Sequence, residues 1–253
     1  MNDYGIQLYS LRDVAEADLK KALRLVSEMG YAGVEFAGFF GHSAEEVASW
    51  LKEYNLVAVG THTGMDEIEP DRIDETIAYH KAIGCKNLIL PCGSFRTEEG
   101  FDHSIELMKE AYPKLKAAGI ELGYHNHSLE YFAAPCGRVP MDEIIEKTEV
   151  SLEVDTFWAY NADLPVVDYL EAHKSRIRLI HLKDGFVNHG LECSFEGWLR
   201  DAKGVSVGAG ELPITDIVNW AEKNGVYVIV ESEGLDPTGP DEVRRCIDFL
   251  KAL

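Results

Sequence analysis

Apolar and polar positions along the chain follow two patterns that alternate from one end to the other. Short apolar runs, typical of buried strands, are followed by segments in which apolar residues recur every three or four positions, as in a helix packed on one face. We predict strands at residues 4–12, 33–38, 56–64, 87–91, 120–127, 151–155, 177–184 and 226–233. We predict helices at residues 13–29, 43–54, 71–83, 101–118, 141–147, 165–172, 213–224 and 240–253.

This alternation of strands and helices predicts the fold. A strand, a helix and a second parallel strand form a right-handed crossover, so the repeat predicts one parallel sheet. Eight such units in about 250 residues match a closed (β/α)8 TIM barrel of the α/β class. A doubly wound open sheet is the competing fold, but the first strand–helix junction, SLRDVAEA, has no glycine-rich phosphate loop, and no GxGxxG or Walker pattern occurs. No segment resembles a linker, so we predict a single domain over residues 1–253.

Composition and charge narrow the class of partner. The 253-residue chain has 44 acidic and 24 basic residues, which gives a formal net charge of −20. Nucleic-acid binding depends on cationic side chains that neutralise phosphates, so this balance disfavours DNA and RNA. No apolar run is long enough to cross a bilayer, and the start, MNDYGIQLYS, lacks the pattern of a secretion signal. We expect a cytoplasmic protein without a membrane partner, and the sequence leaves open whether it forms homo-oligomers.

Charged, amide and imidazole side chains gather at the carboxyl ends of the predicted strands. Buried strands should be apolar throughout, because a buried charge without a partner costs several kcal/mol. In TIM barrels, catalytic residues lie at this end of the strands. The positions are Gln7, Glu35, His62, His125, His127, Asp155, His181, Lys183, Glu231 and Glu233.

A divalent metal ion would satisfy several of these groups at once. Asp155, His181 and Glu231 end the last three predicted strands, which are neighbours in a barrel. A mixed set of carboxylates and imidazole suits Mn, Zn, Co or Fe better than Ca. The alternative is a hydrogen-bonded polar layer that holds no ion, and Asp155 beside Thr156 is also a common turn or helix-capping pattern.

Nine short segments form a specific combination in order along nearly the whole chain. They are GIQLYSLR, GVEFAG, VAVGTHTG, IGCKNLILP, GYHNH, LEVDTFW, IHLKD, VGAGELP and VIVESE. Together they resemble the xylose isomerase-like TIM-barrel family of sugar phosphate isomerases and epimerases. The resemblance implies a (β/α)8 barrel with one divalent metal ion, usually Mn, with Zn, Co, Mg and Fe as alternatives. The family's ligands lie at the ends of strands five to eight, which matches Asp155, His181 and Glu231.

The sequence departs from the family pattern at two positions. Many relatives have a glutamate at the end of strand five that is both ligand and base, whereas this chain has His125 there. Glu130, five residues later, can fold back to replace that carboxylate, and we favour Glu130 over His125 as the fourth ligand. Several relatives have a histidine at the position of Trp158, which cannot bind a metal and is expected to line the pocket and stack on a sugar face.

The remaining candidates receive roles in catalysis or substrate binding. Glu231 is expected to be both ligand and base, and His125 or His127 to act on the opposite face of the substrate. Lys183 can hold a substrate oxyanion, or it can simply pair with Glu231 or with the neighbouring Asp184. Two further residues, Glu35 and His62, are expected to hold substrate hydroxyls or to support the other site residues. The glycine-rich loop VGAGELP can offer backbone amides to a substrate, or it can be only a turn.

The expected chemistry is proton removal beside the carbonyl of a keto sugar. A metal that chelates the carbonyl and the adjacent hydroxyl stabilises the enediolate that forms. One residue on one face then isomerises the sugar, while a base and an acid on opposite faces epimerise it. We therefore predict a sugar or sugar phosphate isomerase/epimerase with a small-molecule substrate.

Three other functions stay open. The same deprotonation beside a 3-keto group can expel a leaving group by β-elimination, which would make the protein a lyase of 3-keto glycosides; some YHNH-bearing relatives point to this. A hydrolytic nuclease on the same barrel needs more metal ligands and contact with DNA, which the net charge of −20 disfavours. The third is a non-catalytic protein that binds a metal or a sugar.

Overall fold

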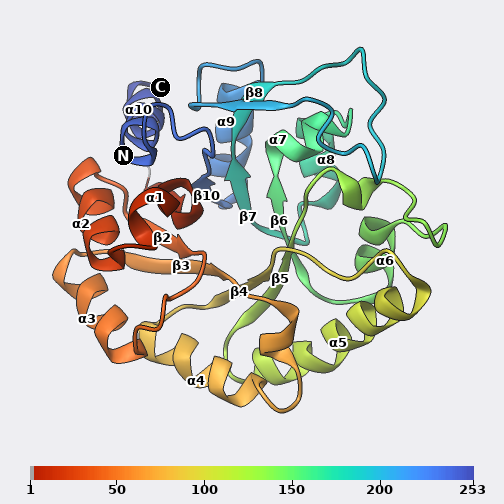
Figure 1. Ribbon diagram of the computed structural model, residues 1–253, viewed down its shortest axis with the longest axis horizontal. Helices are drawn as coiled ribbons and strands as arrows, with labels where there is room; N and C mark the ends of the chain where they lie inside the picture. Colours follow the sequence, from red (N-terminus) through yellow and green to blue (C-terminus); the bar gives the residue numbers. More distant parts are fainter. Residues whose placement is uncertain (1–2) are drawn as a thin grey trace.

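The computed structural model describes residues 3–253 and is shown in Figure 1. Eight parallel strands close into a barrel in the order β1-β10-β7-β6-β5-β4-β3-β2. Their bounds are β1 Gly5–Gln7, β2 Gly33–Phe36, β3 Val57–His62, β4 Asn87–Leu90, β5 Glu121–His125, β6 Ser151–Asp155, β7 Ile177–Leu182 and β10 Tyr227–Val230. The predicted single-domain (β/α)8 barrel is confirmed.

Helices surround the strands on the outside of the barrel (Figure 1). They are α1 Arg12–Ala15, α2 Leu19–Met29, α3 Ala44–Glu53, α4 Ile73–Ile83, α5 Glu98–Ala117, α6 Pro140–Lys147, α7 Thr156–Asn161, α8 Val166–His173, α9 Ile214–Asn224 and α10 Gly239–Ala252. Short 3-10 helices lie at η1 Leu8–Leu11, η2 Met65–Ile68 and η3 Leu129–Tyr131. Among residues 3–253, none of these helices has the length and apolar character needed to cross a membrane.

Local side-chain contacts explain why two predicted elements are shorter than expected. The strand predicted over residues 4–12 ends at Gln7, whose side chain accepts a hydrogen bond from the backbone N of Tyr9 and so starts the 3-10 helix η1. The helix predicted over residues 13–29 is interrupted, because the Asp18 side chain accepts from the backbone N of Lys21 and caps α2.

Two apolar clusters stabilise the barrel. The larger one lies between the strands and the helices that cover them. The smaller one consists of Ile89, Leu179 and Ile229, with Val59 and Tyr227 packed against them. Because side chains two positions apart in a strand share a face, Leu179 lies on the same face of β7 as His181. The interior of the barrel therefore has an apolar lower layer, toward the amino ends of the strands, and a polar upper layer at their carboxyl ends.

A long excursion interrupts the strand–helix repeat after β7. β8 (Asp184–Phe186) and β9 (Lys203–Val205) form a two-stranded antiparallel sheet, and residues 187–202 connect them. Figure 1 shows this segment in cyan, outside the closed barrel. The sequence did not predict β8 or β9, because each has only three residues and the connection has no regular spacing of apolar positions.

Candidate active site

The three expected metal ligands meet at the carboxyl end of the barrel. Asp155 ends β6, His181 lies in β7 and Glu231 directly follows β10, and these three strands are neighbours. His125, the last residue of β5, joins them. One possible ligand atom from each of these four residues lies within 4.8 Å of the other three, and all four side chains are buried.

The Asp155 carboxylate indicates that this group fits a metal ion. Its Oδ1 accepts a hydrogen bond from the backbone N of Trp158 at 2.8 Å, so Asp155 also caps α7. Its Oδ2 is buried and has no hydrogen-bond partner within residues 3–253. A buried, unpaired carboxylate oxygen is costly, and two carboxylates with two imidazoles form a donor set that suits a transition metal. The residues present are therefore compatible with one divalent ion.

Glu153 is a central residue of the site that sequence reasoning missed. Its Oε2 lies 2.9 Å from His62 Nε2, 3.2 Å from His125 Nδ1 and 3.2 Å from His181 Nε2. These four residues form a second group whose possible ligand atoms lie within 4.8 Å of one another. The available signal was its position two residues before Asp155, which places both carboxylates on the same face of β6.

Glu35 lies behind the imidazoles and does not line the cavity described below. Its Oε2 lies 2.6 Å from His181 Nε2 and 3.4 Å from His62 Nε2, and it accepts a hydrogen bond from Gln7 Nε2 at 2.8 Å. The other oxygen of Glu35 and the other oxygen of Glu153 are buried without partners among the described residues. Carboxylates in such positions fix the orientation of histidine rings.

Burial and mutual charge divide these groups into ionised and neutral ones. Burial alone would lower the pKa of His181, but Glu153, Glu35 and Glu231 raise it well above its usual value. Burial would raise the pKa of Glu35, but His62 and His181 lower it. Burial, reinforced by the charge of Glu35, raises the pKa of Glu153 to about 7. Imidazolium and carboxylate groups therefore neutralise each other in this layer.

The other three residues of the first group behave differently from His181. Burial and the neighbouring His181 lower the pKa of His125 well below its usual value, so its ring is neutral, which is the form that binds metals. Burial raises the pKa of Asp155 to about 7, although Lys183 opposes the shift. Glu231 stays ionised, because Lys183 and His181 lower its pKa despite burial.

Lys183 is buried and held by carboxylates. Its Nζ makes an ion pair with Glu233 and lies 3.7 Å from Glu231 Oε2. It also lies over the Trp158 ring, 4.7 Å from the ring centroid. The sequence left open whether Lys183 pairs with Glu231 or with Asp184, and the structure shows the pair with Glu231. The Asp184 carboxylate instead accepts hydrogen bonds from backbone N atoms, as described below.

A cavity of about 240 Å³, which we call the reaction cavity, opens onto this layer. Its lining residues are Tyr9, Ala37, His62, Pro91, His125, His127, Glu231 and Glu233. No lysine or arginine is among them. Burial and the nearby Lys183 lower the pKa of His127 to about 4, so this imidazole is neutral at physiological pH.

Glu130 does not join either of the two groups. Its Oε1 accepts a hydrogen bond from Tyr124 Oη at 3.1 Å, and its Oε2 accepts one from the backbone N of His127 at 2.8 Å. Burial raises its pKa to about 7. The structure thus brings His125, and not Glu130, to the other expected ligands.

Trp158 is 7% exposed and is covered by a second tryptophan. Its ring centroid lies 4.9 Å from that of Trp198, a residue of the excursion that the sequence did not single out. Trp198 also lies 5.4 Å from the His127 ring. Trp158 is absent from the lining of the reaction cavity, so its ring packs against Trp198 and supports that residue.

The amides of the glycine-rich loop are already used within the protein. The buried Asp184 carboxylate accepts hydrogen bonds from the backbone N of Gly208 at 2.9 Å, of Gly210 at 2.9 Å and of Leu212 at 3.2 Å. It also accepts one from the backbone N of Gly185 at 2.9 Å. The loop is thus held by an internal anion, and these amides are not free for a substrate.

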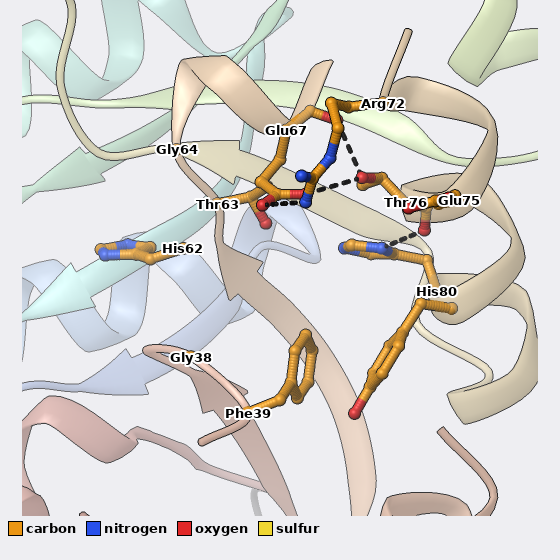
Figure 2. Close-up of a pocket in the computed structure, with 11 residues that line it drawn as sticks. Gly38, Phe39, His62, Thr63, Gly64, Glu67, Arg72, Glu75, Thr76 and His80 are labelled. Atoms are coloured by element: carbon orange, nitrogen blue, oxygen red, sulfur yellow. Dashed lines mark hydrogen bonds and ion pairs between the residues drawn. The ribbon is translucent and has the colours of Figure 1, made fainter. Parts of the chain in front are cut away.

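Two further cavities flank the reaction cavity. The first, which we call the His62 cavity, has a volume of about 390 Å³ and includes Phe39, Arg72 and Tyr79. Figure 2 shows His62 at one side of it and Arg72 held by Glu67. The second, which we call the side cavity, has a volume of about 480 Å³ and shares His127 with the reaction cavity. Its lining residues are Cys92, Gly93, Ser94, Phe95, Arg96, Thr97, His127, Leu129, Glu130, Phe195 and Trp198.

Comparison with known proteins gives one family match and several relatives. A family model described as xylose isomerase-like TIM barrel matches residues 23–253. The chain is similar to inosose dehydratase of Mesomycoplasma hyopneumoniae strain 7448, with 27% identity over 265 residues that cover 91% of this chain and 88% of the relative.

Solved structures share the fold at lower sequence identity. A sugar phosphate isomerase/epimerase from Parabacteroides distasonis has a TM-score of 0.80 and 23% identity, and the match covers 100% of this chain and 99% of that one. The probable 3-DHS dehydratase AsbF from Bacillus anthracis has a TM-score of 0.73 and 11% identity, with 98% of each chain covered.

Proposed function

The chain belongs to the xylose isomerase-like TIM-barrel family, and from this membership and the geometry of the site we propose that it is a divalent-metal-dependent enzyme. It removes the proton beside the carbonyl of a keto sugar or of a cyclic polyol oxidised to a ketone, and thereby isomerises or epimerises its substrate. The observation that supports this most strongly is the group of His125, Asp155, His181 and Glu231, with the buried Oδ2 of Asp155 left without a partner among the described residues.

These four residues would hold one ion, with Mn²⁺ as the first choice and Zn, Co, Mg and Fe as alternatives. A bound ion would polarise the carbonyl and the neighbouring hydroxyl and stabilise the negative charge left by proton removal. Glu153 would orient the His125 ring through Nδ1, and Glu35 would orient the His181 ring through Nε2. Glu153 and Glu35 would thus support two of the proposed ligands.

Glu231 is the proposed base, because its carboxylate lines the reaction cavity. Lys183 and His181 contact this carboxylate and hold it in place. His127 lines the same cavity, and its neutral ring can accept a proton. Glu231 acting alone would isomerise a keto sugar, while Glu231 and His127 acting on two faces would epimerise it.

We further propose that the substrate is not phosphorylated. TIM barrels commonly bind phosphate with the loops after strands seven and eight, but here Asp184 takes the amides of the loop that follows strand seven. The reaction cavity is lined by two glutamates and by no cation. Lys183, which lies beneath it, is already paired with Glu231 and Glu233.

β-Elimination is the second candidate, and two observations favour it. The inosose dehydratase relative is named for such a reaction. In addition, many family members have a second carboxylate base where this chain has His125. Glu231 is therefore the one carboxylate base that remains in the proposed site. In an elimination, Glu231 would take the proton from the carbon beside the carbonyl and return it to the hydroxyl that departs from the next carbon, so that this group leaves as water.

Incubation with substrates in deuterium oxide tests the proposal. The Mn²⁺-supplied protein is given unphosphorylated keto sugars, their phosphates and an inosose, and the products are analysed by mass spectrometry and NMR. We expect deuterium at the carbon beside the carbonyl, and faster exchange with unphosphorylated compounds. An isomeric product indicates isomerisation or epimerisation, and loss of one water indicates elimination. Turnover with direct hydrogen transfer between carbons and no solvent hydrogen contradicts the proposal.

A further inference from the structure

The side cavity lies directly beside the reaction cavity. His127 belongs to the lining of both, so a ligand in one cavity meets its neighbour at this imidazole. The walls of the side cavity come from three parts of the chain: the segment between β4 and α5, the segment after β5, and the excursion over residues 187–202. None of these residues belongs to the proposed metal group.

The aromatic wall of the side cavity is firmly held. The backbone O of Trp198 accepts a hydrogen bond from Nδ2 of the fully buried Asn161 at 2.6 Å. The Trp198 ring packs edge-on against Trp158 with centroids 4.9 Å apart. On another wall, Phe95 packs against Phe101 with centroids 4.9 Å apart. Aromatic rings with few rotatable bonds, fixed from behind, form the preorganised surfaces on which planar and sugar rings bind.

The charges in the side cavity are already balanced. Its one cationic side chain, Arg96, pairs with Glu196 at 2.5 Å and lies 5.5 Å from the centroid of the Phe195 ring. Its one acidic side chain, Glu130, is buried and bound by Tyr124 Oη and the backbone N of His127. An anionic group such as a phosphate would find no free cation here, so the chemistry of these walls fits an uncharged ring.

The reaction cavity is small for a ligand site, and the side cavity enlarges the space beside it. The reaction cavity, at about 240 Å³, is smaller than the 300–1,000 Å³ of typical ligand sites, whereas the side cavity adds about 480 Å³. We propose that the side cavity binds an uncharged second ring, a sugar or an aryl group, of a glycoside whose first ring lies in the reaction cavity. This inference rests on the proposed function for the identity of the first ring.

The His62 cavity is the other place where a second ring could lie, and its chemistry fits less well. Its Phe39 and Tyr79 rings pack against each other with centroids 4.2 Å apart. Figure 2 shows the paired Arg72 and Glu67 across the cavity from Phe39, and Glu75 also belongs to the lining. The lining is thus more strongly charged and offers no tryptophan face.

Calorimetric titration of the full-length, Mn²⁺-supplied protein with four probes tests the inference. The probes are methyl β-glucoside, 4-nitrophenyl β-glucoside, cellobiose and glucose 6-phosphate. One or both two-ring probes should bind at least ~10-fold more tightly than methyl β-glucoside, in line with the contribution of one stacked ring. Preference for 4-nitrophenyl β-glucoside indicates an aryl ring, and preference for cellobiose indicates a sugar. Equal affinity for one-ring and two-ring probes, including no binding by either, overturns the inference.

Three variants locate the second ring. Trp198→Ala should reduce the two-ring advantage to about threefold or less, while affinity for methyl β-glucoside stays the same. Trp50→Ala, on the outer helix α3, is the matched control and should keep the advantage. Phe39→Leu tests the His62 cavity. Loss of the advantage in Phe39→Leu, or its persistence in a folded Trp198→Ala protein, overturns the assignment.

A measurement on the unmodified protein covers the case in which Trp198→Ala fails to fold. Cys92 is an exposed thiol that lines the side cavity, and Cys136 is a partly exposed thiol outside its lining. The tighter two-ring probe should slow alkylation of Cys92 by iodoacetamide, as measured by peptide mapping, and leave Cys136 unchanged. Equal rates at Cys92 with and without this probe contradict the inference.

These readouts are independent of turnover. If the two-ring advantage depends on Trp198 but no substrate exchanges deuterium, the proposed function fails and the binding site stands. If exchange occurs but the two-ring advantage is absent, the binding site fails and the proposed function stands.

Discussion

The interior of the barrel contains two layers with opposite chemistry on the same strands. β7 contributes Leu179 to the lower layer and His181 to the upper one, and β10 contributes Ile229 below, while Glu231 follows it above. The lower layer is a small apolar cluster of Ile89, Leu179 and Ile229, with Val59 and the partly buried Tyr227 packed against it. The upper layer contains carboxylates and imidazoles that are equally buried.

The difference shows which part of the barrel serves stability and which serves function. Buried aliphatic side chains stabilise the fold by about 1.5–3 kcal/mol each. Buried charges cost free energy unless they are paired, and the upper layer shows extensive pairing between Glu35, Glu153 and the imidazoles of His62 and His181. A chain selected only for stability would continue the apolar layer upward. We therefore expect substitutions in the two layers to affect different measurements.

Glu231→Gln should have the largest effect on the proposed reaction. The amide keeps the shape of the side chain but cannot accept a proton, so deuterium exchange into a confirmed substrate should fall by ~10²–10⁴-fold. The metal content must be measured in the same variant, because Glu231 is also a proposed ligand. Exchange at the wild-type rate in a variant that retains its ion would show that another residue is the base.

Ile229→Ala, two positions earlier, should act on stability instead. Removing a fully buried isoleucine leaves a cavity and should lower the free energy of unfolding by about 2–5 kcal/mol in urea titrations. Val57→Ala, at an exposed position on β3, is the control and should change it by less than about 0.5 kcal/mol. If Ile229→Ala instead abolishes metal binding with no loss of stability, the two layers are not separable.

The strands and the ends of the strands could be predicted from the sequence, because both depend on local patterns. The alternation of apolar residues indicated the eight barrel strands, and the carboxyl end of a parallel strand is a defined position, which identified Asp155, His181 and Glu231. The capping box that Ser43 and Glu46 form at the start of α3 is equally local, since both residues lie within one helical turn.

Contacts made through irregular segments could not be predicted. Trp198 meets Trp158 through a loop without periodicity, so nothing in the sequence indicated the pair. The sequence favoured Glu130 over His125 as the fourth ligand, but the direction of the Glu130 side chain depends on how the chain turns after β5. That turn directs the carboxylate to Tyr124 and to the His127 backbone.

Glu130→Gln should separate a structural carboxyl from a metal ligand through its pH dependence. Burial raises the pKa of Glu130 from 4.5 to about 7, so the folded state binds this proton more tightly than the unfolded state. The stability associated with the protonated form is complete below pH 4.5 and is lost as the pH rises through 7. In metal-free protein the variant should therefore be more stable than wild type at pH 8, by up to about 3 kcal/mol, with a smaller difference at pH 5.

Urea titrations of both proteins at the two pH values measure this difference. Glu110→Gln, an exposed position on α5, controls for the loss of one negative charge. A variant that is less stable than wild type at pH 8 would contradict the assignment of Glu130 as a buried carboxyl that is costly to ionise.

Trp158→Phe should have the smallest effect. The phenyl ring still packs beneath Trp198, but the contact with the Lys183 ammonium, now 4.7 Å from the indole centroid, becomes weaker by about 0.5–1 kcal/mol. Because Lys183 contacts the Glu231 carboxylate that lines the reaction cavity, affinity for a confirmed substrate should fall about two- to fivefold, and affinity for Mn²⁺ should not change. Equal losses in both titrations would place Trp158 in the support of the metal group.

Titration with Mn²⁺ is the decisive measurement, because every proposed step depends on an ion at the upper layer. Protein dialysed against chelator and then against buffer is titrated by calorimetry, and bound metal is counted by elemental analysis. We expect one ion per chain in the wild type, none in Asp155→Ala or His125→Ala, and one in Glu130→Gln. A wild-type protein that takes up no metal from excess Mn²⁺, Zn²⁺, Co²⁺, Mg²⁺ or Fe²⁺ would rule out the proposed metal site.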